Sequence, residues 1–564
     1  MAFFQHPPEL DNQYTADRVL LSYLRRTLPP EVLRAVEPSL SEMGELSGGS
    51  LFRLQAEDRL NEPQLSQWDA WGKRHDRIEL TAVWRNARTV ACERGVVATA
   101  YENAHHEFSR VHQFALAYLF DGSTDVYTCP LAMTDGAART LLAHQNRALI
   151  ERAVPRLKSR NPAEAWTSGQ WMTERTGGSD VGLTETVARN EGGQWRLYGT
   201  KWFTSAITSE MALTLARPEG NGSGGQGLAL FYVETRSIDG RANGIFVNRL
   251  KEKLGTRKLP TAELTLEGAL AVPVTKLEHG IRAIVPMLAV TRTWNAVCAV
   301  AAMRRGLALA RDYARRRVQF GAPLNDKPLH LETFADLQAE YEAAFQLAFF
   351  AVELLGKEEN GLLSTTEQKL LRLVTPLAKA CTARQLMSVM PEIVEVFGGA
   401  GYVEDTGIPR LLRDAQVLPI WEGTTNVLSL DALRALTDAE TCHAFEHALQ
   451  TLVHAAKTPA LVTLGAHAIE TTKVAFTHLR EASEQGRAAT EASARGIALT
   501  LARSLELALL VRHAEWSSAV EADARATLAA QRFARIGINR LISRHSPSEA
   551  RALADDLPHA EKSA

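Results

Sequence analysis

The spacing of apolar residues along this chain changes twice, and this change restricts the fold more than any other feature. From about Thr15 to Pro162 apolar residues recur with the period of amphipathic helices. Near Trp166 short alternating runs begin, separated by turns rich in glycine and asparagine, as in a small β domain. After Gly280 the helical period returns and continues to about Leu436 in long segments rich in alanine and leucine. The sequence therefore predicts an α+β multidomain protein.

The length of the chain, 564 residues, exceeds that of one ordinary domain, so several packed units are expected. We predict an N-terminal helical domain over residues 1–165, with a helix across Asp76–Ala104. A middle β domain, either a barrel or a sandwich, is predicted over 166–276. A helical bundle over 277–440 and an extra C-terminal helical domain with a polar tail over 441–564 complete the expected order.

Composition and charge exclude several classes of protein. The formal net charge of −2 gives no global basic field that would attract nucleic acid or a membrane. Five scattered cysteines without a CxxC pair favour reduced thiols over a disulfide framework or a zinc site, and His105, His106 and His112 lack a ligand pattern. Apolar stretches are short and interrupted by charges, and the N-terminus lacks a signal-peptide pattern. We expect a soluble cytoplasmic protein without a metal.

Two segments of the predicted β domain have the residues of a cofactor site. In Trp171–Val181 a hydroxyl, two glycines and a Ser-Asp pair offer approachable backbone N–H groups and short donors for a phosphate or a ring edge. In Gly199–Ser205 a tryptophan could cover a planar cofactor while a threonine bonds its rim. Two ordinary turns beside a core tryptophan remain the alternative. The candidate cofactor contacts are Met172, Thr173, Gly178, Ser179, Trp202 and Thr204.

Two later segments add charge and close backbone approach. The run Arg317-Val318-Gln319-Phe320-Gly321 presents a guanidinium suited to phosphate oxygens, although a solvated helix end is the alternative. Val396–Tyr402 contains three glycines that let backbone press against a cofactor. It is followed by Arg410–Ala415 and by Trp421–Asn426, whose Glu-Gly-Thr turn presents the carboxylate of Glu422 from a tight bend and does not hide it in a helix. A structural carboxylate that caps a helix is the competing interpretation of Glu422.

Together these segments resemble the acyl-CoA dehydrogenase family, with its TEPxxGSD-like loop, WIT-like strand, R-x-x-F-G run and GGxGY…RDA…YEGT signature. The resemblance extends from about residue 70 to 440. It implies bound FAD, with Thr173 near flavin N5, Ser179 at the phosphates, and Trp202 and Thr204 along the isoalloxazine. Arg317 would contact the FAD diphosphate of a neighbouring subunit. The further cofactor contacts implied are Phe320, Gly398, Gly399, Gly401, Thr424 and Asn426.

The family's reaction implies a role for Glu422. Family enzymes remove the α-proton of an acyl thioester while the β-hydrogen leaves as hydride to flavin N5, and a dry carboxylate with a raised pKa is a useful base. A minority of relatives place this base on an earlier helix, just before an arginine. Here Thr291 precedes Arg292, so no carboxylate is available there and Glu422 is the predicted base. Arg292 and Arg434 are the candidate substrate-binding residues, although Arg434 could equally be a surface arginine.

Departures from the family pattern resemble its AidB branch, the alkylation-response proteins. Arg175 replaces the usual proline after Thr-Glu, Glu395 replaces a frequent glutamine, and about 125 residues follow the bundle. Branch members assemble as tetramers built from dimers, and some bind long-chain acyl-CoA or DNA. An alternative function is therefore a DNA-binding or acyl-CoA-sequestering flavoprotein with little turnover. The candidate phosphate contacts, which could also form a solvated face or a subunit contact, are Arg525, Arg532, Arg535 and Arg540.

Overall fold

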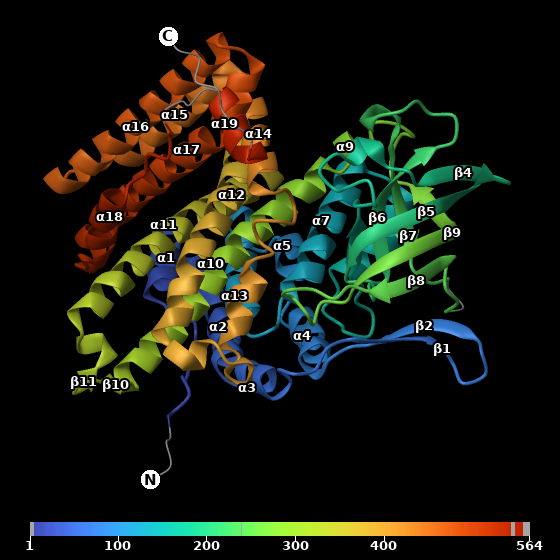
Figure 1. The fold of residues 1–564 in the computed structure, drawn as a ribbon, viewed down its shortest axis with the longest axis horizontal. Helices are drawn as coiled ribbons and strands as arrows, with labels where there is room; N and C mark the ends of the chain where they lie inside the picture. Colours follow the sequence, from blue (N-terminus) through green and yellow to red (C-terminus); the bar gives the residue numbers. More distant parts are fainter. Residues whose placement is uncertain (1–4, 238–239, 543–546, 557–564) are drawn as a thin grey trace.

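The N-terminal region of this computed structural model, which describes residues 5–237, 240–542 and 547–556, is a helical unit that carries one long β hairpin (Figure 1). Most of its helices bury one apolar face against the bundle described below. The helices are α1 (Arg18–Thr27), α2 (Pro30–Gly48), α3 (Ser50–Glu57), α4 (Ala82–Glu93), α5 (Ala98–Glu102), α6 (Ser109–Asp121), α7 (Thr128–His144) and α8 (Arg147–Leu157).

The hairpin corrects the helix predicted across Asp76–Ala104. Strands β1 (Gln64–Trp68) and β2 (Arg74–Glu79) pair antiparallel, and helix begins only at α4. The hairpin lies along the β domain, where the Gln67 side chain donates to the Val247 carbonyl at 2.8 Å and Asp76 accepts from the Val247 N–H at 3.0 Å. Neither strand has a fully buried residue, so no apolar alternation marks it in the sequence.

The middle domain is a seven-stranded sheet that curls back on itself. Its strands run in the order β3-β6-β4-β5-β9-β7, β8 pairs with β9, and an additional β6–β7 pairing closes the sheet into a barrel. Apolar side chains such as Trp171, Leu197, Phe231 and Leu264 fill the interior. The strands are β3 (Ser168–Trp171), β4 (Val187–Glu191), β5 (Gln194–Ser205), β6 (Met211–Pro218), β7 (Ala229–Glu234), β8 (Ile245–Leu250) and β9 (Thr261–Pro273).

Three long helices form the centre of the molecule. After the short α9 (Gly280–Ala283), α10 (Val285–Arg316) packs against α12 (Thr365–Val396), α7 and α11 (Pro328–Glu359). Within the described part of the chain, α10 alone is long and apolar enough to cross a membrane, yet 61% of its most apolar window is buried inside the protein. It is a core helix. The hairpin β10 (Val318–Gln319) and β11 (Ala322–Pro323) joins α10 to α11.

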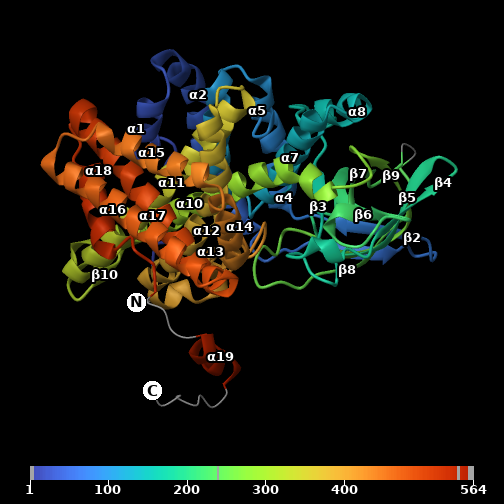
Figure 2. The ribbon, with the colours of Figure 1, turned by 90° about the horizontal axis from the view of Figure 1, so that it is seen from above.

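Helices α15 to α18 stack on the bundle at the side away from the β domain (Figures 1 and 2). Helices α17 and α18 pack on α11, where Arg503 pairs with Glu340 at 2.7 Å. The predicted fold class is therefore confirmed, while the unit limits at 165, 276 and 440 stay predictions. The remaining helices are α13 (Ile408–Ala415), α14 (Thr425–Leu436), α15 (Ala439–His454), α16 (Pro459–Glu484), α17 (Arg487–Trp516), α18 (Arg525–Ile536) and α19 (Pro547–Asp555).

Candidate active site

Glu422 lies in the tight turn that precedes α14, and its backbone adopts a conformation rare for a side-chain-bearing residue. Its φ is +55° and that of the following Gly423 is +105°. A left-handed glutamate costs free energy and persists where the surroundings hold it. Two cations do so here: Arg292 Nε donates to the Glu422 carbonyl at 3.3 Å, and Lys379 Nζ donates to the Gly423 carbonyl at 2.6 Å.

The Glu422 carboxylate faces the bundle and α10. Thr291 Oγ1 lies 2.8 Å from its Oε2, and the Gln170 side chain on β3 also bonds to it. Burial raises the pKa of Glu422, while Thr291, the charges of Arg292 and Lys379, and Gln170 oppose this rise. The residue is partly accessible at the surface although its carboxylate is enclosed by protein. An enclosed carboxyl with a raised pKa can act as a general base.

A second ring of charges supports this turn. Asp431 on α14 accepts from Arg292 at 2.8 Å and from Arg372 at 2.6 Å, so Arg292 is anchored between Asp431 and the turn. The predicted substrate contact Arg434 lies farther out, 3.7 Å from Asp431 and 72% exposed. Lys379 is fully buried, and this burial lowers its pKa to about 7.

The predicted flavin loop is tied to the β barrel by a buried ion pair. Glu174 accepts from Lys201 Nζ, from the Glu185 N–H and from Thr186 Oγ1, each at 2.6 Å. Directly before it, the Thr173 carbonyl accepts from the Trp202 N–H at 3.0 Å, so the two predicted cofactor segments lie side by side. These bonds hold the loop against the barrel.

Individual loop residues differ in how accessible they are. Met172 and Thr173 are half-buried, whereas Gly178 and Ser179 are exposed. A Cβ on Gly178 would lie 2.6 Å from Thr173 Oγ1, so a side chain there would displace that hydroxyl. The loop thus presents a hydroxyl, backbone N–H groups and little side-chain bulk, which suits a polar ring edge or a phosphate.

The two rim residues on β5 have different surroundings. The Trp202 ring is half-buried, with Lys251 Nζ 3.6 Å from its centroid on one face. Thr204 is buried, and its Oγ1 donates to the Ala262 carbonyl at 2.5 Å. The hydroxyl hydrogen of Thr204 is therefore already used, which leaves only its lone pairs for a ligand.

The remaining cofactor candidates form a separate group at the other end of α10. Arg317 and Phe320 lie at the β10–β11 hairpin, on the side of the bundle away from the β domain (Figures 1 and 2). The glycine run reaches the same place, because Phe397 packs on Tyr313 with ring centroids 4.7 Å apart. A Cβ on Gly398 or Gly399 would meet nothing within 4 Å, and a Cβ on Gly401 would collide with the Val394 carbonyl at 2.1 Å.

Phe320 is 97% exposed at the tip of its hairpin, with a left-handed φ of +48°. Within one protomer the candidate cofactor residues therefore fall into two separate groups, and the β10–β11 hairpin lies on the side of the bundle away from the β domain (Figure 1). Thr424 and Asn426 stay on the side of Glu422: Thr424 caps α14, and Asn426 Oδ1 accepts from Arg495 on α17 at 3.4 Å.

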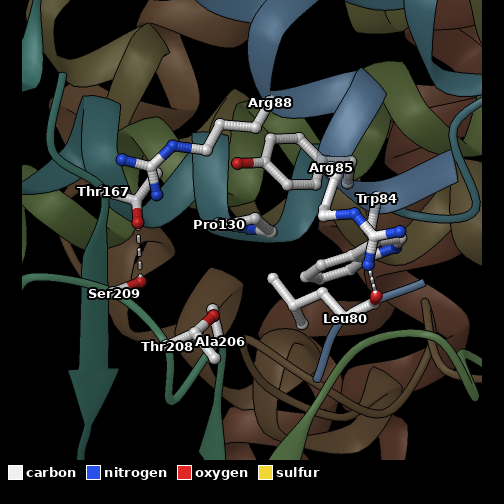
Figure 3. A pocket seen from close by; sticks show the side chains of 10 residues that line it. Leu80, Trp84, Arg85, Arg88, Pro130, Thr167, Ala206, Thr208 and Ser209 are labelled. Atoms are coloured by element: carbon white, nitrogen blue, oxygen red, sulfur yellow. Dashed lines mark hydrogen bonds between the residues drawn. The ribbon is translucent and has the colours of Figure 1, made fainter. Parts of the chain in front are cut away.

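A small cavity between α4 and the β domain lies outside this site (Figure 3). Its volume is about 100 Å³, and Trp84, Tyr127 and Pro130 form its walls. Arg88 beside it pairs with Glu210 at 2.8 Å. This volume is small beside the roughly 300–1,000 Å³ of ligand pockets, so we assign it no ligand.

Comparison with known proteins agrees with the geometry. Four family models match: adaptive response protein AidB N-terminal domain (5–162), acyl-CoA dehydrogenase middle domain (169–269), acyl-CoA dehydrogenase C-terminal domain (278–437) and acyl-CoA dehydrogenase 11 C-terminal domain-like (440–556). "Acyl-CoA dehydrogenase family member 11" of Caenorhabditis elegans is 42% identical over 532 residues, covering 92% of this chain and 86% of that protein. The chain belongs to the acyl-CoA dehydrogenase family.

Two further relatives place this acyl-CoA dehydrogenase family member more closely. "Putative acyl-CoA dehydrogenase AidB" of Escherichia coli is 31% identical over 447 residues, covering 77% of this chain and 80% of that protein. The crystal structure of C. elegans ACDH-11 in complex with C11-CoA superposes with a TM-score of 0.93 at 38% identity, covering 100% of this chain and 97% of that one. The predicted family and AidB-like branch are confirmed, and the extra helices form an acyl-CoA dehydrogenase 11-like domain.

Sequence reasoning missed three residues that hold the site of this family member. Lys379, Asp431 and Glu174 are buried charges whose partners lie far away in the chain or across the barrel. The only local signal was a lysine within the apolar run Leu377–Ala380. Over the described ranges, no group of three or more His, Cys, Asp or Glu side chains could hold a metal ion.

The arginines considered for DNA are partly neutralised. Arg525 pairs with Asp523 at 2.8 Å, and Arg532 pairs with Asp336 at 2.5 Å and with Glu332. The remaining two, Arg535 and Arg540, are exposed. Since paired guanidinium groups release fewer counterions from a phosphate backbone, the stripe offers a weaker DNA surface than its sequence suggests.

Proposed function

We propose that this protein is a soluble, cytoplasmic, FAD-dependent acyl-CoA dehydrogenase in which Glu422 is the catalytic base. The observation that carries the proposal is the Glu422 turn. A carboxyl group with a raised pKa is held in a left-handed turn by Arg292 and Lys379, on the side of the bundle that faces the flavin loop. A helix-capping role would not require the buried Lys379 and the half-buried Arg292 to bond to the backbone of the turn.

The reaction follows from what these residues can do. Glu422 takes the proton from the α-carbon of the acyl thioester, and the electron pair of that C–H bond forms the α,β double bond as the β-hydrogen leaves as hydride. Bound FAD supplies the hydride acceptor. Enclosure of the carboxylate keeps it basic enough for a weak carbon acid. Arg292 and Lys379 fix the direction of the carboxylate by bonding to the backbone carbonyls of Glu422 and Gly423.

The residues present fit FAD. On the β domain, the loop residues Met172, Thr173, Gly178 and Ser179 and the ring of Trp202 would hold the flavin, with the Thr204 oxygen as an acceptor. Gln170 Oε1 beside them is buried without a hydrogen-bond partner. A second group of contacts would come from a partner subunit in a homotetramer built from dimers. This group comprises Arg317, Phe320, Gly398, Gly399 and Gly401. Thr424 and Asn426 complete the candidate set.

The substrate class follows from the family and from one relative. ACDH-11 was crystallised with C11-CoA. We propose an acyl-CoA of similar length here, with the exposed Arg434 available to the CoA phosphates. Arg292 is a weaker candidate for substrate binding than its sequence position suggested, because Asp431 and the Glu422 carbonyl already engage it.

An anaerobic titration of the purified protein tests the proposed reaction. Acyl-CoA thioesters from short to long chains, including undecanoyl-CoA, are added while the flavin absorbance is followed. Bleaching by one range of chain lengths is expected, and the matching free fatty acids should leave the spectrum unchanged. Dithionite serves as the control that the flavin can be reduced. A flavin that dithionite bleaches and that no acyl-CoA reduces would overturn the proposal.

A second candidate function is DNA binding or acyl-CoA sequestration with little turnover. The exposed arginines Arg535 and Arg540 favour the first of these. A gel-retardation assay with duplex DNA at low salt tests it, with Arg535→Ala/Arg540→Ala as the variant. Failure of the wild-type protein to retard DNA would contradict the DNA-binding function. Tight acyl-CoA binding without flavin reduction would favour acyl-CoA sequestration.

A further inference from the structure

Thr291 has more hydrogen-bond acceptors around its hydroxyl than it can satisfy at once. Its Oγ1 lies 2.8 Å from Glu422 Oε2, 3.0 Å from the Met287 carbonyl and 3.4 Å from the Leu288 carbonyl. A hydroxyl has one hydrogen to donate and two lone pairs with which to accept. The hydroxyl hydrogen therefore points to one of these oxygens at a time. The two shortest contacts, to Glu422 Oε2 and to the Met287 carbonyl, cannot both be donated by Thr291.

Two arrangements use the same atomic positions. When Glu422 is a carboxylate, Thr291 donates its hydrogen to Oε2 in a charge-assisted bond. When Glu422 is protonated, its own O–H donates to Thr291 Oγ1, and the threonine hydrogen turns to the Met287 carbonyl. Only the hydroxyl hydrogen rotates between the two arrangements, so neither requires movement of a heavy atom.

The other groups that face Glu422 do not have this capacity. Arg292 carries only donors, and both Arg292 and Lys379 bond to backbone carbonyls of the turn instead of to the carboxyl oxygens. Gln170 bonds to the carboxylate from β3, but its amide would have to flip before its oxygen could accept. Cys129 on α7 is within electrostatic reach, and burial raises its pKa to about 12, so it stays a neutral thiol.

A base that takes up a proton must be accommodated in both of its charge states. A buried O–H without an acceptor is unfavourable, as is a buried carboxylate without donors. We propose that Thr291 is a positioning residue that serves both protonation states of Glu422, donating to the carboxylate before proton transfer and accepting from the carboxylic acid afterwards. This role rests on the proposed function of Glu422 as the base, and it gives a purpose to a threonine where some relatives carry the base itself.

Three variants and a matched control separate this role from simple packing. Thr291→Val removes the hydroxyl at nearly equal volume, Thr291→Ala removes it should valine disturb the packing, and Thr291→Ser restores it. Thr293→Val is the control, because Thr293 is also buried on α10 and donates to the Ala289 carbonyl at 2.9 Å without a bond to Glu422. Flavin spectra and thermal melts confirm that each variant is folded.

The first measurement needs no substrate. The carboxyl C=O stretch of protonated Glu422 is followed by infrared spectroscopy during a pH titration, and the band is assigned by its loss in Glu422→Gln. Removal of the acceptor in Thr291→Val and Thr291→Ala should move the band to higher wavenumber. Thr291→Ser and Thr293→Val should keep the wild-type position. An unmoved band in both hydroxyl-free variants would overturn the proposal, whether or not any acyl-CoA is oxidised.

The second measurement follows both directions of the reaction by stopped flow. Undecanoyl-CoA reduces the oxidised protein, and trans-2-undecenoyl-CoA reoxidises the reduced protein. Without the hydroxyl that orients the Glu422 carboxyl for proton transfer, both directions should slow about tenfold in Thr291→Val, and Thr291→Ser should recover most of both rates. A slower forward reaction with an unchanged reverse reaction would show that Thr291 only donates. Absence of flavin reduction in the wild type would instead contradict the proposed function and leave the infrared result standing.

Discussion

At the scale of single residues, the site is set by opposing influences on one carboxyl group. Burial raises the pKa of Glu422, and the nearby cations Arg292 and Lys379 limit that rise. Burial in turn lowers the pKa of Lys379 to about 7, from an ordinary value of 10.5. Lys379 thus has two effects: its charge limits the pKa of Glu422, and its hydrogen bond to the Gly423 carbonyl holds the backbone of the turn.

Replacement of Lys379 by methionine tests this double role. The Gly423 carbonyl loses its donor, which should lower the free energy of unfolding by about 1–3 kcal/mol. Glu422 loses a cation that favours its charged form, so the acid limb of the flavin-reduction rate should move to higher pH. Stopped-flow rates across pH measure the shift. Lys369→Met on the same helix is the control, because Lys369 pairs only with Asp438 and Glu440 at the surface. An unchanged pH profile would contradict the role.

Part of this site could be predicted from the sequence, whereas the residues that hold Glu422 and Arg292 in place could not. The Glu-Gly-Thr turn marks Glu422 because its residues are contiguous and the turn needs glycine. The clamp by Lys379 joins residues 44 positions apart in the chain, through the packing of α12 beneath the turn. No local period or spacing encodes that contact. The same reason hides Asp431 behind Arg292.

At the scale of elements, the docking of α17 on α11 and α12 depends on a buried acid. Glu506 is fully buried and accepts from Gln385 Nε2 at 3.2 Å, with Cys381 Sγ at 3.7 Å. Beside it Arg503 pairs with Glu340 at 2.7 Å. Burial raises the pKa of Glu506 to about 8, from an ordinary value of 4.5. Folding therefore favours the neutral acid at this interface.

This raised pKa predicts a pH-dependent attachment of the C-terminal helices. The stabilising contribution of Glu506 should be fully present below about pH 4.5 and lost as pH rises through about 8. Hydrogen exchange along α17 should accordingly quicken between about pH 4.5 and 8, once corrected for intrinsic exchange. Glu506→Gln should flatten this dependence, and Glu491→Gln, at the exposed start of α17, should not. Equal pH dependence in Glu506→Gln and the wild type would refute the prediction.

The elements themselves were predicted with uneven success. The long apolar helices and the alternating barrel strands each have a characteristic hydrophobic period in the sequence. The predicted order of helical and β domains was therefore correct. The β1–β2 hairpin was not predicted, because its strands bury no residue fully and so lack such a period. They are held by polar contacts to Val247 of β8. Such an arm depends on a surface that only the folded barrel provides.

At the scale of the whole molecule, the candidate cofactor contacts divide into two separated groups. One group surrounds Glu422 and the flavin loop, and the other lies at the β10–β11 hairpin with its exposed Phe320 (Figure 1). A second copy of the chain that brings its hairpin to the flavin loop would complete each site. The assembly would then be required for FAD binding as well as for stability.

Phe320→Asp tests the assembly. The wild-type protein should have a mass four times the 61.9 kDa of one chain when measured by light scattering. The charged variant should dissociate and lose FAD, because an exposed aromatic anchor becomes a desolvated charge at the interface. Leu553→Asp is a control at a residue that is also exposed, 78%, but lies on α19. A variant with unchanged mass and full flavin content would contradict the assignment.

The most direct test of the central claim is single-turnover flavin reduction in Glu422→Gln. The amide has nearly the shape of the carboxylate and leaves Arg292 and Lys379 their backbone acceptors, so FAD and acyl-CoA should still bind. With undecanoyl-CoA, or the acyl-CoA that best bleaches the wild type, we predict that the wild-type flavin is reduced and the variant flavin is not. Reduction of the variant at a rate near that of the wild type would show that another group takes the α-proton.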